Sequence, residues 1–394
     1  MQSGYEIIQG NALDELRKLP AGHAYTCVTS PPYWALRDYG IEPSIWETSI
    51  SDPNCEHEWE MFEVKSGQRG GTNNPLFGAF NGDTHISSVN YGFCPCGAWL
   101  GTLGLEPTLE LFIEHICQIF DEVWRVLKDD GTLWLNLGDC YNGSGGAGGD
   151  YSKGGIREGQ PKYPGRLNPD LAPKNLLGVP WRIALALQER GWILRSDIIW
   201  HKPNPMPAGV TDRPIMAHEY IFLFAKQQKY YYDADSIRVK AKHPVIGKQP
   251  PKKTESKEEV TLDGMSMTRA GEITMGAGSR PRGLNDYIST HGRHSHPKGR
   301  HPHSVWKVAT KPYKGAHFAT FPPDLITPCV KAGCPEGGIV LDPFSGTATT
   351  GQVALENGRN YCGIEIGDDY IKMAEDRLSQ VDKKLGLTDK TEWL

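Results

Sequence analysis

Apolar residues recur along this chain in two patterns, as short continuous runs and as stretches in which they return every three or four positions. The first pattern is typical of buried strands and the second of helices with one buried face. The clearest helical stretch covers residues 107–127, with Pro107 at a plausible first helical position, and Asp129-Asp130-Gly131 then predicts a turn. Further helices are predicted over residues 12–19, 180–190, 322–332 and 368–381, and strands over residues 5–8, 24–29, 132–137, 193–201, 218–226, 338–341 and 360–366. Strands that alternate with helices through short links predict an α/β fold with a mostly parallel sheet.

Two stretches interrupt this alternation. Residues 52–101 are rich in glycine and asparagine, contain few apolar runs, and are bracketed by Cys55-Glu56-His57 and Cys94-Pro95-Cys96. We interpret them as an insert in the α/β fold. Residues 142–173 are rich in glycine and are predicted to form a surface loop.

The composition is that of a soluble globular protein, with 394 residues of which 38% are hydrophobic and 23% charged. A chain of this length can bury a substantial core, and it contains no apolar run of membrane-spanning length. Nine cysteines at scattered positions argue against a disulfide framework and for a reducing compartment. We therefore expect the protein in the cytoplasm, without a membrane partner.

The distribution of charge changes this picture more than the total does. The formal net charge is −5, which by itself argues against a nucleic-acid partner. Residues 238–314, however, contain 16 Lys and Arg against 6 Asp and Glu, and residues 291–303 include a cluster of histidines. A basic segment on an acidic chain is the pattern expected for local binding of a polyanion. The arginines and lysines between these histidines would repel a cation, so phosphate contact is favoured there over metal binding.

The strand over residues 24–29 leads directly into Thr29-Ser30-Pro31-Pro32-Tyr33-Trp34. Two prolines make this loop stiff and leave nearby carbonyl groups without backbone donors. Such a loop can offer a hydroxyl and a carbonyl oxygen to an amino group, with an aromatic face beside them for a flat ring. These features suit an enzyme that acts on the exocyclic amine of a nucleobase; a proline-rich turn with a core tyrosine is the structural alternative.

Residues 342–351 form a glycine-containing turn between a predicted strand and a predicted helix. Small residues let a ligand approach the backbone, and the start of a helix favours negative charge, so this arrangement is typical of nucleotide sites. The turn lacks the glycine spacing of dinucleotide sites and the Gly-Lys-Ser/Thr of a P-loop, which argues against NAD and ATP. Glu365, at the end of the following strand, could accept hydrogen bonds from ribose hydroxyls. An ordinary turn with a surface glutamate remains the alternative for this stretch alone.

Taken together, these segments resemble the beta class of amino-group DNA methyltransferases, which use S-adenosylmethionine and in which the Pro-Pro-Tyr loop precedes the cofactor loop. The matching segments follow the family order and span most of the chain. They are Thr-Ser-Pro-Pro-Tyr-Trp at 29–34, Trp-His-Lys-Pro-Asn-Pro-Met-Pro at 200–207, His-Phe-Ala-Thr-Phe-Pro-Pro at 317–323, Asp-Pro-Phe-Ser-Gly-Thr at 342–347 and Gly-Ile-Glu-Ile at 363–366.

The resemblance implies a Rossmann-like, mostly parallel α/β methyltransferase fold, circularly permuted, with a small cysteine-bearing insert and a target-recognition region. Residues 1–51 and 102–234 would form the catalytic part, 52–101 the insert, 235–310 the recognition region and 311–394 the cofactor-binding part. It also implies double-stranded DNA as partner and a bacterial, archaeal or phage-encoded protein. Whether a cognate restriction endonuclease exists, and whether the protein is a monomer or a homodimer, stays open.

The cofactor residues follow from the same resemblance. The turn that begins at Asp342 would line the methionine and adenosine parts of S-adenosylmethionine, and Glu365 would bind the ribose. Asn11, beside Ala12, stands at the adenine edge where family members often have aspartate, so that an acceptor oxygen is kept and the charge is lost. The implied cofactor residues are Asn11, Ala12, Phe318, Thr320, Asp342, Phe344, Gly346, Thr347 and Glu365.

The implied catalytic residues are Ser30, Pro31, Pro32 and Tyr33. The Ser30 hydroxyl and the Pro31 carbonyl would accept the two amine hydrogens and aim the nitrogen lone pair at the methyl donor, while Tyr33 stacks on a flipped-out base. Serine before Pro-Pro-Tyr favours the N4 amine of cytosine, with the N6 amine of adenine as the alternative. A non-catalytic DNA-binding protein that senses the cofactor, and an RNA or protein amine as substrate, are more remote alternatives.

Methylation of cytosine at C5 is disfavoured, because it requires a cysteine nucleophile. Pro328-Cys329 lies within a predicted apolar helix, and Pro95-Cys96 lies in the cysteine-bearing insert.

Two further sets of residues are candidates for binding. Cys55, His57, Cys94 and Cys96 supply four soft ligands, as a structural zinc site requires, and the alternative is a set of free thiols on an insert. In the basic segment, which lies where the family has its recognition region, phosphate and base-edge contacts are expected of Arg280, Arg282, Arg293, Lys298 and Arg300.

Overall fold

The computed structural model divides the chain into two compact units, Met1–Ser236 with His303–Leu394, and Ile237–Pro302. The residues described are 4–34, 41–47, 51–52, 54–65, 88–143, 168, 170–205, 209–240, 260–262, 265–267, 273–274, 296, 298–310 and 321–386. Most of the glycine-rich stretch predicted as a surface loop, residues 142–173, lies outside them.

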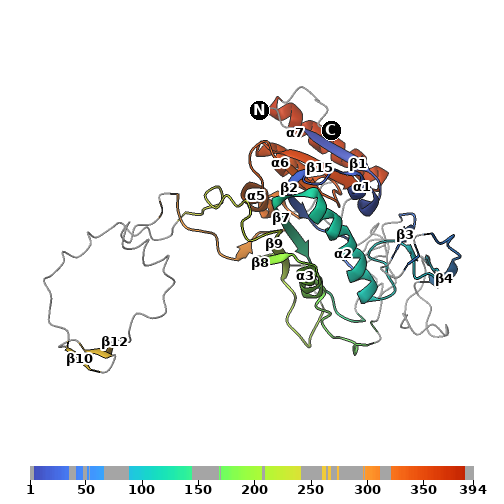
Figure 1. Ribbon diagram of the computed structural model, residues 1–394, viewed down its shortest axis with the longest axis horizontal. Coiled ribbons are helices and arrows are strands. Elements are labelled where there is room, and N and C mark those ends of the chain that lie inside the picture. Colours follow the sequence, from blue (N-terminus) through green and yellow to red (C-terminus); the bar gives the residue numbers. More distant parts are fainter. Residues whose placement is uncertain are drawn as a thin grey trace. The chain divides into compact units, whose positions relative to one another are not determined.

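An eight-stranded sheet forms the centre of the larger unit (Figure 1). Its strands are β1 (Tyr5–Gln9), β2 (Ala24–Thr29), β7 (Leu127–Leu137), β8 (Ile193–His201), β9 (His218–Ala225), β13 (Val305–Lys307), β14 (Ile339–Asp342) and β15 (Asn360–Glu365). They lie in the order β1-β15-β14-β2-β7-β9-β8-β13, and only β9 runs antiparallel to its neighbours. The predicted mostly parallel α/β sheet is confirmed, and β2, early in the chain, lies beside β14, late in the chain.

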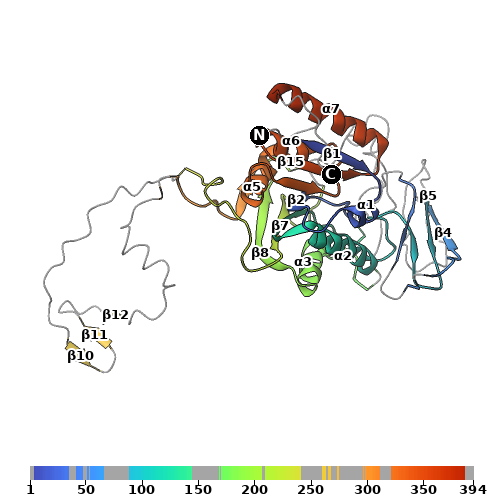
Figure 2. The same ribbon diagram turned by 45° about the horizontal axis from the view of Figure 1, so that its top comes forward.

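Helices cover both faces of this sheet (Figure 2). They are α1 (Ala12–Lys18), α2 (Leu109–Val126), α3 (Val179–Glu189), α5 (Pro323–Gly333), α6 (Thr349–Glu356) and α7 (Asp368–Leu385). On one side α2 packs against α1 and α3, and on the other α6 packs against α5 and α7. Five of them correspond to helices predicted by residue range, within about four residues at their ends, and α6 is the helix expected after the turn at residues 342–351.

The clearest stretch of apolar residues at helical spacing in the sequence forms α2. Leu109, Phe112, Ile116 and Phe120 are completely buried, so one face of the helix lies in the main hydrophobic core. The start of the helix differs from the prediction. The Thr108 hydroxyl accepts a 3.2 Å hydrogen bond from the backbone N–H of Leu111, which makes Thr108 the N-cap and leaves Pro107 outside the helix.

The turn predicted at Asp129-Asp130-Gly131 is wrong, because these residues belong to β7. Pairing with β2 shifts register there: Ala24 lies opposite Leu127, whereas Thr26 lies opposite Thr132. The extra residues are accommodated as an irregularity in a continuous strand. A sequence that reads as a turn is therefore held extended by its neighbour in the sheet.

The insert region contains a second, antiparallel sheet. Its strands are β3 (Ser44–Trp46), β4 (Glu60–Lys65), β5 (Ser88–Phe93) and β6 (Trp99–Gly101), in the order β3-β6-β5-β4. The sheet thus begins before residue 52, within the residues that precede the insert. Trp46 and Trp99 stack on His115 of α2, at ring-centroid distances of 4.7 and 5.2 Å, and join this sheet to the main core.

The smaller unit, Ile237–Pro302, has a three-stranded antiparallel sheet of β10 (Val260–Leu262), β11 (Met265–Met267) and β12 (Ile273–Thr274). It falls within the region expected to recognise the target. An isolated antiparallel bridge joins Val239 to Arg300 near the two ends of this unit.

Candidate functional site

Two loops meet at the carboxyl edge of the main sheet. The segment that begins at Ser30 follows β2, and the turn that begins at Asp342 follows the neighbouring parallel strand β14. Thr29 donates a 2.6 Å hydrogen bond from its hydroxyl to the Asp342 carboxylate, and both residues are buried. Because the ends of adjacent parallel strands form the usual ligand crevice of such sheets, this is the expected place for a nucleotide-like ligand.

Asp342 is a buried carboxylate that organises the second loop. Besides Thr29, the backbone N–H of Phe344 donates a 3.1 Å hydrogen bond to it. Burial raises the pKa of Asp342 to about 6, although the hydrogen bonds from Thr29 and Phe344 act to lower it. Through these two hydrogen bonds Asp342 joins the turn to the end of β2.

The turn brings Gly346 to Glu365, at the end of β15. The backbone N–H of Gly346 donates a 2.8 Å hydrogen bond to Oε2 of Glu365, and that of Gly367 donates one of 2.8 Å to Oε1. Gly346 has φ of +52° and Ala348 φ of +53°, so the chain turns sharply into α6 through left-handed backbone. Glycine is the residue that adopts this conformation at least cost.

Glu365 and Thr347 are the polar side chains suited to hold a ligand at this turn. Glu365 is 8% exposed, and burial raises its pKa against the effect of the backbone N–H groups of Gly367 and Gly346. The Thr347 hydroxyl is buried and has no hydrogen-bond partner among the residues described. A buried hydroxyl without a partner is costly, so these residues fit a bound polar molecule.

Asn11 lies next to Glu365 because β1 pairs with β15, with Gln9 opposite Glu365. Its Oδ1 accepts a 2.9 Å hydrogen bond from the backbone N–H of Leu13 and caps α1, and its Nδ2 donates to the Ser44 hydroxyl at 3.1 Å. Ala12 is the first residue of that helix. The structure thus brings Asn11 and Ala12 close to Glu365 and the turn that begins at Asp342, with the Asn11 side chain used for capping α1.

Of the other predicted cofactor residues, only some lie in the part of the chain that the structure describes. Phe344 is half-buried and packs against the main core. Phe318 and Thr320 lie outside the residues described.

The Ser30-Pro31-Pro32-Tyr33 segment packs against residues that precede α2. Pro31 is buried, and a Cβ added to Gly104 would lie 3.2 Å from Cβ of Pro32. Trp34 is buried and donates a 3.1 Å hydrogen bond from its indole nitrogen to the backbone oxygen of Glu106. These contacts hold Pro32 and Trp34 against the segment that precedes α2.

Tyr33 lies over the residue that follows β7. A Cβ added to Gly138 would be 2.6 Å from Cε2 of the Tyr33 ring, so only glycine allows this approach. The Tyr33 hydroxyl donates a 3.0 Å hydrogen bond to Oε2 of Glu219 and lies 3.4 Å from the Ser30 hydroxyl and from Oδ1 of Asn136.

Sequence reasoning missed the polar residues around Tyr33. Glu219 forms an ion pair with Lys202, and Asn136 donates a 3.3 Å hydrogen bond from Nδ2 to Glu219. Lys202 directly follows β8, Glu219 is the second residue of β9, and Trp200 pairs with Glu219 in the sheet. Lys202 belongs to a segment that the family resemblance had singled out, whereas Glu219 carried no signal of its own.

The cysteine nucleophile required for C5 methylation has no candidate in these loops. Cys329 is completely buried within α5, and burial raises the pKa of its thiol far above the ordinary value. Cys96 belongs to the cluster described next.

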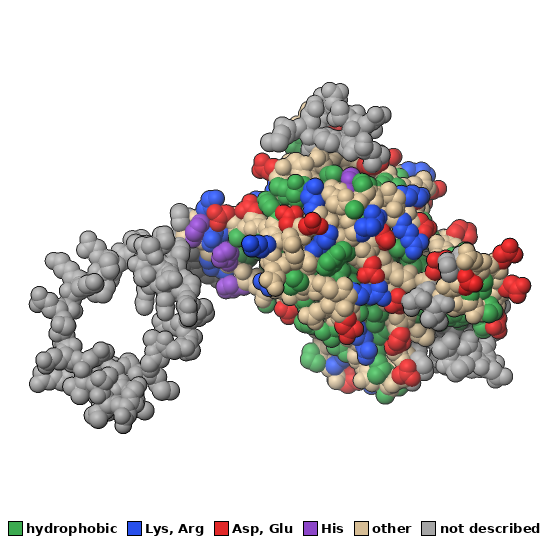
Figure 3. All heavy atoms as spheres, viewed as in Figure 1, with side chains coloured by type: hydrophobic (Ala, Val, Ile, Leu, Met, Phe, Trp, Pro, Cys, Tyr) green, Lys and Arg blue, Asp and Glu red, His purple; other side chains and the backbone are tan. Residues whose placement is uncertain are grey.

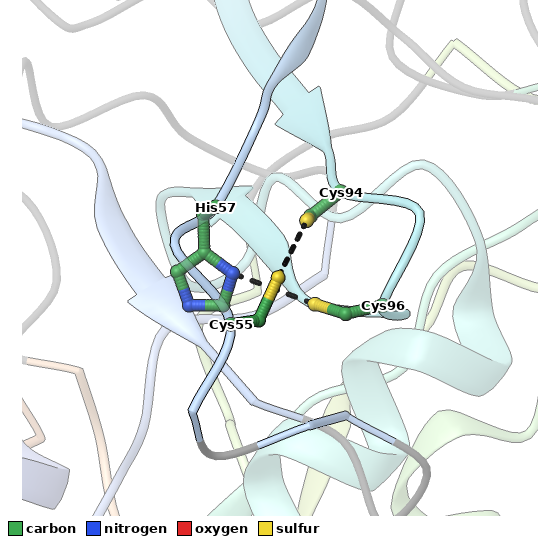
Figure 4. A group of neighbouring side chains, drawn as sticks. All are labelled: Cys55, His57, Cys94 and Cys96. Atoms are coloured by element: carbon green, nitrogen blue, oxygen red, sulfur yellow. Dashed lines mark hydrogen bonds between the residues drawn. The ribbon is translucent and has the colours of Figure 1, made fainter.

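Cys55, His57, Cys94 and Cys96 converge, with all four potential ligand atoms within 4.8 Å of one another (Figure 4). The Cys55 and Cys94 sulfurs are 3.7 Å apart, and the Cys96 sulfur is 3.4 Å from Nδ1 of His57. Desolvation acts to raise the pKa of Cys94, but hydrogen bonds from the Cys96 backbone and neighbouring side chains lower it to about 6. The structure therefore brings together the four side chains that the sequence singled out as candidate metal ligands.

The basic segment is described only in part. Arg280, Arg282 and Arg293 lie outside the residues described, whereas Lys298 and Arg300 lie within them. Lys298 is exposed and Arg300 half-buried, next to the bridge with Val239. Over the larger unit, the face shown in Figure 3 intersperses acidic and basic side chains. In the described part of the chain, no helix has the length and apolar character needed to cross a membrane.

Comparison with known proteins gives consistent matches over nearly the whole chain. The model of the N6/N4 methyltransferase family, described as DNA methylase, matches residues 25–376. The Type II methyltransferase M.XycI of Xanthomonas campestris pv. cyanopsidis is 37% identical over 382 residues, which cover 95% of this chain and 88% of M.XycI. M.Cfr9I of Citrobacter freundii is 35% identical over 387 residues, covering 96% and 89%, and M.SmaI of Serratia marcescens is 34% identical over 376 residues, covering 95% and 90%.

Proposed function

Because the chain belongs to the N6/N4 DNA methylase family, we propose that it transfers a methyl group from S-adenosylmethionine to the N4 amine of cytosine in DNA. The observation that carries the proposal is the junction of the Ser30 loop with the Asp342 turn through the Thr29–Asp342 hydrogen bond. It holds an acceptor loop for an amine beside a turn suited to a nucleoside ligand.

The residues of the turn fit the cofactor. Glu365 is a buried carboxylate that can accept hydrogen bonds from ribose hydroxyls, and the Thr347 hydroxyl is available to hydrogen-bond a polar group of the ligand. When bound, S-adenosylmethionine would supply an electrophilic methyl group to the amine nitrogen, with the S–C bond electrons kept by sulfur and the amine proton passed to water.

The Ser30 loop would position the target base. Its hydroxyl and the Pro31 carbonyl accept hydrogen bonds from the amine, and the Tyr33 ring, held over Gly138, provides a stacking surface for a base rotated out of the duplex. A serine hydroxyl at position 30, where aspartate would place a charge, supports cytosine N4 over adenine N6. No covalent bond between base and protein is required.

Treatment of duplex DNA with the protein and cofactor, followed by digestion and mass analysis of the nucleosides, tests this assignment. N4-methylcytosine is the expected product. N6-methyladenine as product would replace cytosine N4 by adenine N6 as the target amine. 5-Methylcytosine as product would overturn the mechanism.

We also propose that the smaller unit, Ile237–Pro302, contacts DNA through its basic residues. Lysines and arginines that contact phosphates release counterions, so binding weakens steeply with salt. Lys298→Ala and Arg300→Ala should each reduce the salt dependence of DNA binding, and an unchanged dependence in both would argue against this surface. Cleavage protection of the methylated DNA would identify a restriction endonuclease that shares its target.

We propose, finally, that the four-residue cluster in the insert binds a structural zinc ion. Tetrahedral zinc with bonds of about 2.3 Å to sulfur places two sulfur ligands about 3.8 Å apart, close to the Cys55–Cys94 separation of 3.7 Å. Metal analysis of the purified protein should find one zinc per chain, lost in Cys96→Ser and kept in Cys140→Ser, which changes a cysteine outside the cluster. Much less than one zinc in the wild type would remove the proposal.

A further inference from the structure

The Tyr33 hydroxyl lies between two polar side chains from distant parts of the chain. Ser30 donates to it at 3.4 Å, and it donates to Oε2 of Glu219 at 3.0 Å. We propose that Glu219 is a positioning residue that sets the direction of these hydrogen bonds and thereby makes Ser30 an acceptor for the target amine. This inference rests on the proposed function.

The direction is set at the carboxylate end. An ionised carboxylate can only accept hydrogen bonds. Glu219 is held by the ammonium group of Lys202 on one oxygen and by Nδ2 of Asn136 on the other, at 3.3 Å. The Glu219 and Lys202 side chains are 17% and 20% exposed, so the pair is largely shielded from solvent screening. The Tyr33 hydroxyl donates to this carboxylate.

Tyr33 has one hydroxyl hydrogen, and two acceptors from the described part of the chain lie near it, Oε2 of Glu219 at 3.0 Å and Oδ1 of Asn136 at 3.4 Å. Hydrogen bonds to a charged acceptor are shorter and stronger than neutral ones, so the hydrogen points to Glu219. Asn136 supports this arrangement, because its Nδ2 also donates to the backbone oxygen of Tyr220 at 3.0 Å. The oxygen of Tyr33 is then left as an acceptor for Ser30.

The consequence for Ser30 is chemical. With its hydrogen directed to Tyr33, the Ser30 oxygen offers lone pairs to an incoming N–H group. In the opposite arrangement Ser30 would direct its own hydrogen at the amine and compete for the nitrogen lone pair that must attack the methyl group. The 3.4 Å separation of Ser30 and Tyr33 is long, as is common for catalytic hydrogen bonds without substrate, which shorten when it binds.

A purely structural role for Glu219 predicts a different behaviour. The Lys202–Glu219 pair joins β8 to β9, and its loss could lower activity simply by loosening this edge of the sheet. Such an effect would not require the Tyr33 hydroxyl. The two roles are separated by asking whether the effect of changing Glu219 disappears when that hydroxyl is removed.

The test is a double-mutant cycle of Glu219→Gln and Tyr33→Phe, with single-turnover methylation rates measured at saturating DNA and cofactor. Glutamine keeps the shape of Glu219 but can donate from its amide to Tyr33. Glu219→Gln should slow methyl transfer roughly 10- to 100-fold, with KM for DNA and cofactor changed less than about twofold. In the Tyr33→Phe background the same substitution should add less than about twofold. Glu114→Gln, which breaks the 2.6 Å pair with Arg190 away from the loops, is the control and should keep the wild-type rate.

An unchanged rate in Glu219→Gln, or an equal loss in the two backgrounds, would overturn the inference. Inactive wild-type protein would instead overturn the proposed function, so the two failures are distinct. If Glu219→Gln does not fold, the cycle of Ser30→Ala and Tyr33→Phe tests the same chain of hydrogen bonds. Its effects should be non-additive, and additive effects would contradict the inference.

Discussion

Thr29 and Asp342 share a 2.6 Å hydrogen bond although 313 positions separate them in the sequence. The bond joins the strand that carries the Ser30 loop to the strand that carries the glycine-containing turn. Both partners are buried, so the contact is shielded from water and rigid. Two loops from opposite ends of the chain are thereby fixed in one site.

The stability of the protein should depend on pH through Asp342. Its pKa is about 6 in the folded protein against an ordinary 3.8, so the folded state binds more protons between these values. The free energy of unfolding should therefore fall as pH rises from about 4 to about 7, by at most roughly 3 kcal/mol from this residue. In Asp342→Asn this component should be absent. Urea unfolding of both proteins across that range measures it, and parallel pH profiles would contradict the assignment.

Gly138→Ala should displace the Tyr33 ring, because the new Cβ would lie 2.6 Å from Cε2 of that ring. We expect a fall in methylation rate of roughly 10-fold or more, with cofactor affinity retained. Gly209→Ala is the matched control, since a Cβ at Gly209 would meet no atom within 4 Å. Equal activity of the two variants would show that the position of the Tyr33 ring does not limit the reaction.

Glu106 should be important for stability. It is completely buried, its Oε2 accepts from the backbone N–H of Gly104 at 2.8 Å, and its Oε1 lies 3.1 Å from Nδ1 of His115. Glu106→Ala would leave both partners buried without an acceptor and should cost about 3–5 kcal/mol of unfolding free energy. Glu122→Ala, which removes a partly exposed ion pair with Arg125 within α2, should cost less than about 1 kcal/mol. Similar losses in urea unfolding would refute the distinction.

Removal of metal should loosen the insert sheet. Cys94 directly follows β5, and Cys96 lies in the turn between β5 and β6, so a bound ion would link these strands to the segment that holds Cys55. Chelation, or Cys96→Ser, should lower the melting temperature by several degrees. A chelator-treated Cys96→Ser protein should show no further change, and a wild-type melting curve unaffected by chelator would contradict a structural metal.

The main sheet and its helices could be predicted because apolar spacing in each is strong and local. Residues 193–201 and 218–226 were predicted as strands and form β8 and β9 almost residue for residue. The insert sheet was missed because β4, β5 and β6 lie in a stretch with few apolar runs. β3 and β6 have three residues each and are defined by pairing across long separations, as in Trp46 opposite Trp99.

The candidate site also contains residues that the sequence could identify and residues that it could not. Ser30, Tyr33 and Asp342 could be found because they stand in segments that the family resemblance had identified. Glu219 could not, since its relation to Tyr33 depends on antiparallel pairing that places the start of β9 at the carboxyl edge of the parallel strands. The sequence also could not show that Asn11 uses its side-chain oxygen to cap α1.

The most direct test of the account uses S-adenosylmethionine that carries a deuterated methyl group, duplex DNA, and the wild-type and Tyr33→Ala proteins. After digestion, mass analysis should find the labelled methyl group on the exocyclic amine of a base, on cytosine N4 by the proposal, with wild-type protein and not with Tyr33→Ala. Label on a ring carbon, or equal labelling by both proteins, would contradict the central claim that the Ser30 loop positions a base amine for methyl transfer.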